Sequence, residues 1–240
     1  MKAVAIASGG MDSTTLLYHL KDGEYDTLVI SYNYGQRHKK ELDFVKVTCD
    51  KLGFQHRIVD LTNITDLIAS SSLTGDADVP DGHYTDLTMR ATVVPNRNAI
   101  MLSIAAGAAM NIGARFVATA VHGGDHFIYP DCRPPFIDAI SEAMRTGAGE
   151  LFVEGGFMGV YAPYVNRDKT AIAEDGDKLG VPWLDTWSCY KGGDIHCGRC
   201  GTCVERREAF MLAEVDDPTP YADRAFAWEA IAKHKAETNS

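Results

Sequence analysis

Short apolar runs alternate along the chain with segments in which apolar residues recur every three or four positions. The short runs predict buried strands at residues 3–7, 27–34, 57–61, 115–121 and 181–187. The periodic segments predict helices at residues 12–20, 38–52, 98–112, 134–145, 168–179, 204–213 and 222–235. Strands that alternate with helices indicate a parallel sheet joined by right-handed crossovers. We therefore expect an α/β fold with helices on both faces of a parallel sheet.

The pattern is lost between residues 70 and 88, where Ser, Asp, Gly and Thr predict a long loop or lid. The longest apolar stretch, residues 99–110, is too short to span a bilayer and is better explained as a buried helix. The N-terminal apolar run ends at Ser8, too early for a signal peptide. We therefore expect no membrane partner and a cytoplasmic protein whose thiols stay reduced.

Composition limits the number of domains and the kinds of partner. A chain of 240 residues, 45% of them hydrophobic, is enough for one large domain or for a domain plus a small module. The 23 basic and 33 acidic residues give a formal charge of −10. This balance disfavours binding of bare nucleic acid through a general basic surface, although a local basic groove would be compatible with it.

A loop rich in glycine and hydroxyl groups, SGGMDSTT, joins the first predicted strand to the first predicted helix. Its glycines allow backbone N–H groups to approach an anion, and the helix N-terminus adds unpaired N–H groups. The loop lacks the lysine of a Walker A motif. Asp12 is expected either to cap the helix or to help hold Mg²⁺. An ordinary capped turn would use part of this sequence, but the full pattern favours phosphate binding by Ser8, Gly9, Gly10, Met11, Asp12, Ser13, Thr14 and Thr15.

Four of the six cysteines lie close together, at Cys189, Cys197, Cys200 and Cys203. Glycines between them allow tight turns, and four thiolates complete a tetrahedral Zn²⁺ shell that leaves no place for water. The spacing therefore predicts a structural zinc site. An iron–sulfur cluster is the alternative, although no Cys-Pro follows at the ferredoxin distance. Cys49 falls on the apolar face of a predicted helix, where we expect a core thiol.

Three further polar motifs follow or flank apolar elements: GQRH at residues 35–38, VPNRN at 94–98 and GGDHFIYPDCR at 123–133. Each alone would fit a capped turn, but three at one edge of a sheet favour a site. SGGMDS resembles the pyrophosphate loop of the ATP pyrophosphatase (PP-loop) superfamily. With the YGQRH, VPNRN, GDHFIYPDCR and CYKGG…CGRCGTC motifs, in this order, the chain resembles the 7-cyano-7-deazaguanine synthase family of queuosine biosynthesis from about residue 3 to about residue 210. Asn96 departs from an expected glycine, and residues 125–128 depart from the usual small residues.

The resemblance implies a Rossmann-like adenine-nucleotide alpha-hydrolase fold over residues 1–185, with a C-terminal zinc-binding helical region of four cysteine ligands, residues 186–240, packed on it. It also implies an ATP-dependent ligase that converts 7-carboxy-7-deazaguanine and ammonia to 7-cyano-7-deazaguanine (preQ0). The acid and then the amide would be adenylated, with release of AMP and pyrophosphate. A single domain leaves no room for a glutaminase, so ammonia would come from solution or a partner.

The resemblance also suggests residue roles. The loop would bind the β and γ phosphates of Mg-ATP together with Arg37, while Arg97 and Lys169 would neutralise phosphate or the substrate carboxylate. A solvated helix position would suit Lys169 equally well. The deazaguanine ring would be bound by the carboxylate of Asp131 or Asp125 and stacked on Tyr129 or Phe127, and Arg133 would either contact substrate or pair with Asp131. His38 and His126 are expected to be structural more than proton shuttles.

Two other functions stay open. A tRNA-thiolating enzyme of the same superfamily would use Cys132 as a persulfide carrier, although the charge of −10 favours a small substrate. A non-catalytic zinc module that binds nucleic acid would rest on Arg206 and Arg207 alone. The resemblance suggests a homodimer, for which Phe226, Trp228 and Ile231 are candidates, though they would equally suit a core. Whether the product would serve tRNA or DNA modification stays open.

Overall fold

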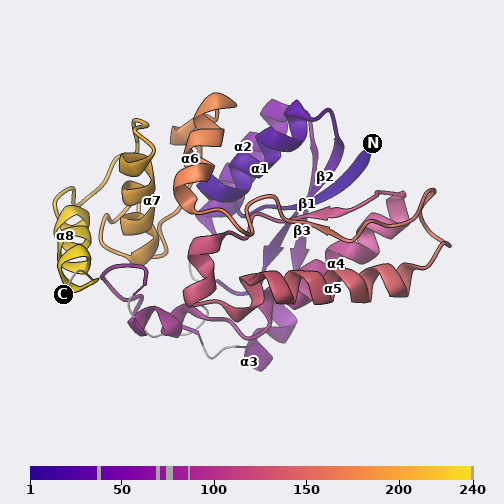
Figure 1. The fold of residues 1–240 in the computed structure, drawn as a ribbon, viewed down its shortest axis with the longest axis horizontal. Helices are drawn as coiled ribbons and strands as arrows, with labels where there is room; N and C mark the ends of the chain where they lie inside the picture. The colour runs from indigo at the N-terminus through magenta and orange to yellow at the C-terminus, as the bar shows by residue number, and fades with distance from the viewer. Residues whose placement is uncertain (37–38, 69–70, 74–77, 86, 239–240) are drawn as a thin grey trace.

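The computed structural model describes residues 1–36, 39–68, 71–73, 78–85 and 87–238. Its sheet has five strands in the order β3-β2-β1-β4-β5, and every neighbouring pair is parallel (Figure 1). The strands are β1 (Lys2–Ile6), β2 (Asp26–Asn33), β3 (Gln55–Asp60), β4 (Val117–Ala118) and β5 (Val160–Tyr161). The chain order reverses direction at β1, and the crevice beside such a switch point is where open α/β sheets bind ligands.

Helices cover both faces of the sheet, as the sequence predicted (Figure 1). Alternate residues of β1 separate the two layers: Ala3 and Ala5 pack under one set of helices and Val4 under the other. The helices are α1 (Met11–Asp22), α2 (Lys40–Leu52), α3 (Thr65–Ile68), α4 (Arg97–Ile112), α5 (Pro134–Ala148), α6 (Lys169–Lys178), α7 (Gly201–Leu212) and α8 (Phe226–Thr238). α1, α2 and α6 lie on the first face, and α4 and α5 on the second.

The strand predicted at residues 181–187 is wrong. The segment contains a 3-10 turn, Trp183–Asp185, and the fifth strand is Val160–Tyr161. The apolar side chains of 181–187 are buried against helices instead: Trp183 packs edge-on against Phe210 of α7, with ring centroids 4.8 Å apart. Pro182 also removes a backbone donor from the segment. β5 has only two residues, too few for an alternating pattern to reveal it.

The other differences concern element ends and the expected loop. Part of the segment 70–88, and residue 38 of the predicted second helix, fall outside the described residues. The predicted loop ends at the 3-10 helix Leu87–Thr92, which begins one residue before its expected end and leads toward α4. None of the described helices is long and apolar enough to cross a membrane. The core thiol expected at Cys49 is confirmed, because its side chain is 1% exposed on α2.

The C-terminal helices are held by a buried arginine. Arg206 of α7 is 0% exposed and pairs with Asp217 at 3.1 Å, while it also donates to the hydroxyl of Thr186 at 2.6 Å. A buried charge is tolerated when it is paired and hydrogen-bonded in this way. Arg207 is also buried, and its guanidinium lies 4.3 Å from the ring of Trp228 on α8. The two arginines expected to support a nucleic-acid surface are therefore structural.

The residues considered for a dimer contact divide between two environments. Ile231 is buried and packs with Phe226 against Val204 of α7. Trp228 stays 40% exposed. Most of the apolar face of α8 is therefore used within the chain.

Candidate active site

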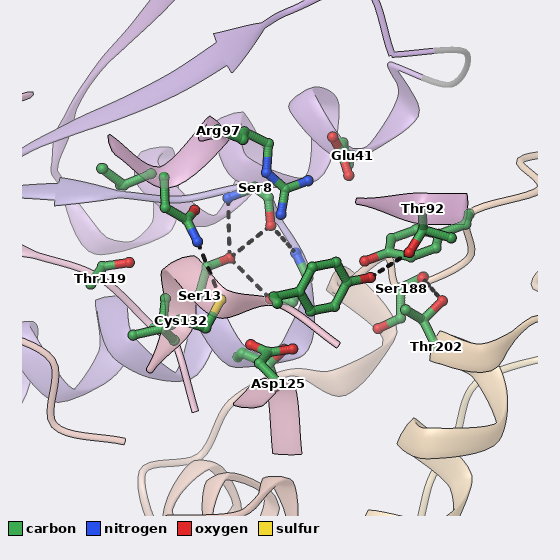
Figure 2. A pocket seen from close by; sticks show the side chains of 18 of the residues that line it. Ser8, Ser13, Glu41, Thr92, Arg97, Thr119, Asp125, Cys132, Ser188 and Thr202 are labelled. Atoms are coloured by element: carbon green, nitrogen blue, oxygen red, sulfur yellow. Dashed lines mark hydrogen bonds between the residues drawn. The ribbon is translucent and has the colours of Figure 1, made fainter. Parts of the chain in front are cut away.

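A cavity of about 240 Å³ lies at the carboxyl ends of β1, β2 and β4 (Figure 2). Parallel strands bring the ends of β1, β2 and β4 to one edge, so loops far apart in sequence meet there. The predicted site residues that line this cavity are Ser8, Gly10, Asp12, Ser13, Arg97, Asp125, Tyr129, Cys132 and Lys169. Arg37 falls outside the described residues.

The glycine-rich loop is preformed. The Ser13 hydroxyl accepts the backbone N–H groups of Ser8 and Gly9, both at 3.2 Å, and donates to the carbonyl of Gly10 at 3.2 Å. Gly10 is the N-cap of α1 and makes no side-chain capping bond, and the first intrahelical bond runs from the Thr14 N–H to the Gly10 carbonyl. The helix N-terminus therefore offers the cavity unpaired N–H groups, which suit an anion. Four residues of the predicted loop lie outside the cavity lining: Gly9, Met11, Thr14 and Thr15.

Gly9 is required where the loop meets α2. Its φ is +83°, and a Cβ there would collide with the backbone oxygen of Glu41. We expect Gly9→Ala to lower the free energy of unfolding by about 2 kcal/mol or more, because left-handed strain and a backbone collision add. Gly53→Ala is the matched control, since Gly53 has φ +71° with open space around it and should lose only about 1 kcal/mol. Urea unfolding of both variants measures the difference, and equal losses would contradict the close approach.

Arg97 begins α4 and places its guanidinium in the cavity, 5.8 Å from the ring centroid of Tyr34 (Figure 2). Within the described part of the chain, no carboxylate lies within ion-pair distance of Arg97. The preceding residue, Asn96, has a left-handed backbone with φ 51°. Asparagine tolerates this conformation better than most residues, which explains how it stands where the resemblance led us to expect glycine. Arg97 is therefore a cation positioned for an anionic ligand.

Lys169 is not a solvated helix residue. It is buried at the start of α6, and its ammonium pairs with Glu205 at 2.5 Å and with Asp12 at 3.2 Å. Burial acts to lower the pKa of Lys169, but the nearby carboxylates of Asp12 and Glu205 outweigh it and raise that pKa. Lys169 is therefore held as a cation beside the loop.

His122 completes this network. Its Nδ1 accepts the Gly124 N–H at 3.1 Å, which leaves Nε2 directed at carboxylates. Nε2 lies 3.5 Å from Asp125 and 3.9 Å from both Asp12 and Glu205. Asp12 thus faces Lys169 and His122 and does not cap α1 by a side-chain bond.

Some residues of the 123–133 motif line the cavity, and others bond to neighbouring backbone. Asp125 and Tyr129 line the cavity, and the Tyr129 hydroxyl is 2.6 Å from that of Thr92. Asp131 does not line it: its carboxylate accepts the backbone N–H of Asn98 at 3.0 Å, near the start of α4. Arg133 donates to the carbonyl of His126 at 2.8 Å and is exposed, as is Phe127.

Cys132 lines the cavity but is 4% exposed. Its sulfur accepts the side-chain amide of Asn98 at 3.2 Å. Burial first, and then the charges of Asp125 and Asp131, raise the pKa of the Cys132 thiol. Thiolates, not thiols, act as nucleophiles, so the buried position of this thiol disfavours a nucleophilic role.

The four clustered cysteines bring their sulfurs within 4.8 Å of one another. The sulfurs of Cys197 and Cys203 are 3.9 Å apart, close to the roughly 3.8 Å expected for a tetrahedral ion with metal–sulfur bonds of about 2.3 Å. Backbone N–H groups of Arg199 and Cys200 point at the Cys197 sulfur, both at 3.3 Å. The donor set therefore fits a single metal ion.

The cysteine region also forms one wall of the cavity. Residues that flank the metal ligands line it: Ser188 and Tyr190 on either side of Cys189, and Thr202 before Cys203. The Thr202 hydroxyl donates to the carbonyl of Ser188 at 2.7 Å, which ties the two segments together (Figure 2). The backbone N–H of Trp187 donates to the Gly9 carbonyl at 2.8 Å, so this region also contacts the glycine-rich loop.

Several cavity residues were not predicted from the sequence: Tyr34, Glu41, Ser188, Tyr190, Thr202 and Glu205, together with His122 behind the lining. Tyr34, Tyr190 and Thr202 belong to recognised motifs, and the others lie within a few residues of one. Membership of a motif or proximity to one is the signal that would have found them, because their spacing shows no periodicity.

A parallel α/β sheet with an S-G-G-x-D-S loop at its first helix defines a PP-loop protein with an adenine-nucleotide alpha-hydrolase type of fold. The family model described as "Queuosine biosynthesis protein QueC" matches residues 2–214, and the chain belongs to this family.

Curated relatives support this placement. The chain is 54% identical over 236 residues to a 7-cyano-7-deazaguanine synthase of Brucella anthropi, covering 98% of this chain and 100% of that one. It is 55% identical to the synthase of Ruegeria pomeroyi, covering 97% and 99%. Among solved structures, a U34-tRNA thiolase NcsA from Methanococcus maripaludis aligns with a TM-score of 0.46 at 14% identity, covering 100% of this chain and 67% of that one. So distant a likeness does not bear on the reaction.

Proposed function

We propose that the protein converts 7-carboxy-7-deazaguanine and ammonia to 7-cyano-7-deazaguanine at the expense of ATP. One observation carries this proposal: the glycine-rich loop, Arg97, Asp125 and Lys169 all line one cavity in a chain whose curated relatives are synthases of this compound. Adenylation turns a carboxylate oxygen into a good leaving group, so ammonia can form the amide. Adenylation of the amide oxygen then lets AMP leave as the nitrile forms.

The loop side of the cavity suits the phosphates of ATP. The N-terminus of α1 would bind the β and γ phosphates, and Lys169 would add positive charge beside them. When Mg²⁺ is bound, it would neutralise phosphate charge, and Asp12 is the carboxylate placed to hold it. One carboxylate oxygen of Asp12, Oδ1, is buried without a hydrogen-bond partner among the described atoms, as suits a group that binds a cation.

Other residues of the cavity lining suit the deazaguanine. We propose that Asp125 accepts hydrogen bonds from the N1–H and 2-amino edge, because it lines the cavity while Asp131 supports α4. Tyr129 and Tyr190 would stack on the ring. Arg97 would bind the substrate carboxylate or the α phosphate. Arg133 then keeps only a supporting role for the 123–133 motif.

One assay tests the reaction. Purified protein is incubated with ATP, ammonium and 7-carboxy-7-deazaguanine, and the products are identified by mass. We expect the nitrile together with AMP and pyrophosphate. ADP in place of AMP would contradict the pyrophosphatase chemistry, and an unchanged acid would contradict the proposed function.

We assign zinc, one ion per chain, to the four cysteines. Four thiolates give a closed tetrahedral shell, so the ion would be structural. Metal analysis of purified protein tests the assignment. Stoichiometric iron with charge-transfer absorption would overturn it.

The tRNA-thiolating alternative is disfavoured by the buried thiol of Cys132. We expect Cys132→Ser to keep nitrile synthesis within about tenfold of the unsubstituted protein, because the nitrile chemistry needs no thiolate. Steady-state turnover measures it. Loss of turnover beyond about a hundredfold, with unchanged thermal unfolding, would favour a persulfide carrier.

The remaining proposals concern partners, location and assembly. We propose an enzyme that binds no nucleic acid directly and works in the cytoplasm, where the cysteines that hold the metal stay reduced. Ammonia would come from solution or from a partner protein. We also propose a homodimer, for which the exposed ring of Trp228 is a candidate contact.

A further inference from the structure

Glu41 is a carboxylate of the cavity wall to which the roles proposed above assign nothing. It is the second residue of α2, and Gly9 of the phosphate loop lies directly against its backbone. Its side chain lines the same cavity as Arg97 (Figure 2). The group therefore shares the cavity with the loop that would hold ATP and with the cation that would hold the reacting anion.

The side chain of Glu41 is held in place by a neutral partner. The Gln36 amide donates to Glu41 Oε1 at 3.3 Å. Gln36 is itself fixed, since it accepts the Tyr34 N–H at 2.9 Å and donates to the Tyr32 carbonyl at 3.1 Å. One carboxylate oxygen is thus oriented by an ordered amide, and no ion pair to Glu41 occurs within the ranges that the structure describes.

The groups that face Glu41 set its proton affinity. Among the described residues, Arg97 from α4 and Tyr34 from the end of β2 are the charged and titratable ones. The Lys40 ammonium next to Glu41 bonds instead to the carbonyls of Gly193 and Asp194. Burial raises the pKa of Glu41 to about 7, although the Gln36 hydrogen bond and the Arg97 charge act to lower it. A carboxylate of this kind exchanges protons near neutral pH, as a general base must.

We propose that Glu41 is the general base that takes protons from the substrate nitrogen, an inference that rests on the proposed function. In the first half-reaction the ammonia lone pair attacks the acyl adenylate, the nitrogen gives a proton to Glu41, and AMP leaves with its oxygen. Glu41 then releases this proton to solvent. In the second, the amide oxygen attacks the α phosphorus of ATP and pyrophosphate leaves, and the nitrogen gives one proton to solvent, so the adenylated amide is a neutral imidate with one remaining N–H. Glu41 takes that proton, the electron pair forms the third C–N bond, and the C–O bond to AMP breaks.

The second half-reaction gives the cleaner test, because it involves no free ammonia and therefore no ammonium titration. The protein is supplied with ATP and the 7-amide of deazaguanine, and nitrile is followed from about pH 5.5 to about pH 9, a range that spans the titration of a perturbed carboxylate. Because the pKa of Glu41 is raised, the active carboxylate is present above about pH 7 and is lost as the pH falls through that value. We therefore expect kcat of the unsubstituted protein to fall as the pH is lowered through about 7, which gives the pH–rate profile an acidic limb.

Glu41→Gln should lower kcat by about a hundredfold and remove the limb near pH 7, with thermal unfolding unchanged. Glu41→Asp keeps a carboxylate and should retain the limb with an intermediate rate. Asp43→Asn is the matched control, an exposed carboxylate in the same first turn of α2, and should leave both rate and profile unchanged.

Two outcomes would overturn the inference. If Glu41→Gln keeps the acidic limb, another group titrates and Glu41 is not the base. If the variant raises KM for the deazaguanine amide and leaves kcat unchanged, Glu41 binds substrate and does not transfer protons. Failure of the unsubstituted protein to form nitrile would instead refute the proposed function itself, so the two failures are distinguishable.

Discussion

Replacing Arg97 with Ala is expected to lower kcat/KM for nitrile formation by about 10³-fold and to leave the fold intact. The guanidinium lines the cavity, and within the described residues it has no carboxylate partner. Its charge is therefore free to act on a ligand, and removal of one preorganised electrostatic group costs about 10²- to 10³-fold in rate. Charge-assisted, bidentate binding of phosphate or carboxylate places the expected loss at the upper end.

Steady-state kinetics with varied ATP and varied deazaguanine measure this effect and identify the ligand. A rise in KM confined to one substrate would show which anion Arg97 binds. Arg133→Ala is the matched control, because Arg133 belongs to the neighbouring motif but is exposed, and its side chain bonds only to the carbonyl of His126 in the described structure. Equal losses in the two variants, or unchanged turnover in Arg97→Ala, would refute the role.

The sequence predicts the sheet and the loop because both depend on local pattern. β1, β2 and β3 show apolar runs that a short window detects, and the glycine pair stands where β1 meets α1. β5 was missed because two residues carry no period. Residues 181–187 were assigned to a strand because an apolar run can be buried against helices as well as within a sheet, and only the packing of Trp183 on Phe210 distinguishes the two.

The site was predictable as a set of motifs but not as a set of contacts. Asp125 and Asp131 have the same side chain within one motif, yet one lines the cavity and the other accepts the backbone N–H of Asn98. The sequence left open whether Lys169 binds an anion or lies on a solvated helix face, because its partners, Asp12 and Glu205, lie far from it in the sequence. Such pairing depends on how α1, α6 and α7 pack, which no local pattern contains.

The pairing of Lys169 with Glu205 connects α6 to α7, the helix that begins within the four-cysteine region. Glu205 on α7 follows shortly after the final cysteine, and it holds Lys169 on α6 beside the phosphate loop. The four clustered cysteines alternate with cavity residues along the chain. The four-cysteine region therefore forms one wall of the cavity, and we expect loss of the proposed metal to affect the proposed chemistry.

Cys200→Ser is accordingly expected to release the metal, to lower the free energy of unfolding by about 3 kcal/mol or more, and to reduce nitrile formation at least about a hundredfold. Cys200 is 0% exposed and serves as N-cap of α7, so loss of its metal bond would free the start of that helix, which includes Thr202. Zinc content, thermal unfolding and turnover are measured on the same preparation.

Cys49→Ser is the matched control, because Cys49 is a buried thiol of α2 that lies outside the cluster and the cavity. It should cost about 1–2 kcal/mol of stability through a buried hydroxyl, and keep the metal and the activity. Full turnover of Cys200→Ser without bound metal would show that the cavity wall holds its shape unaided. A loss of activity with the metal retained would assign Cys200 a role other than ligation, so metal content decides between the two explanations of an inactive variant.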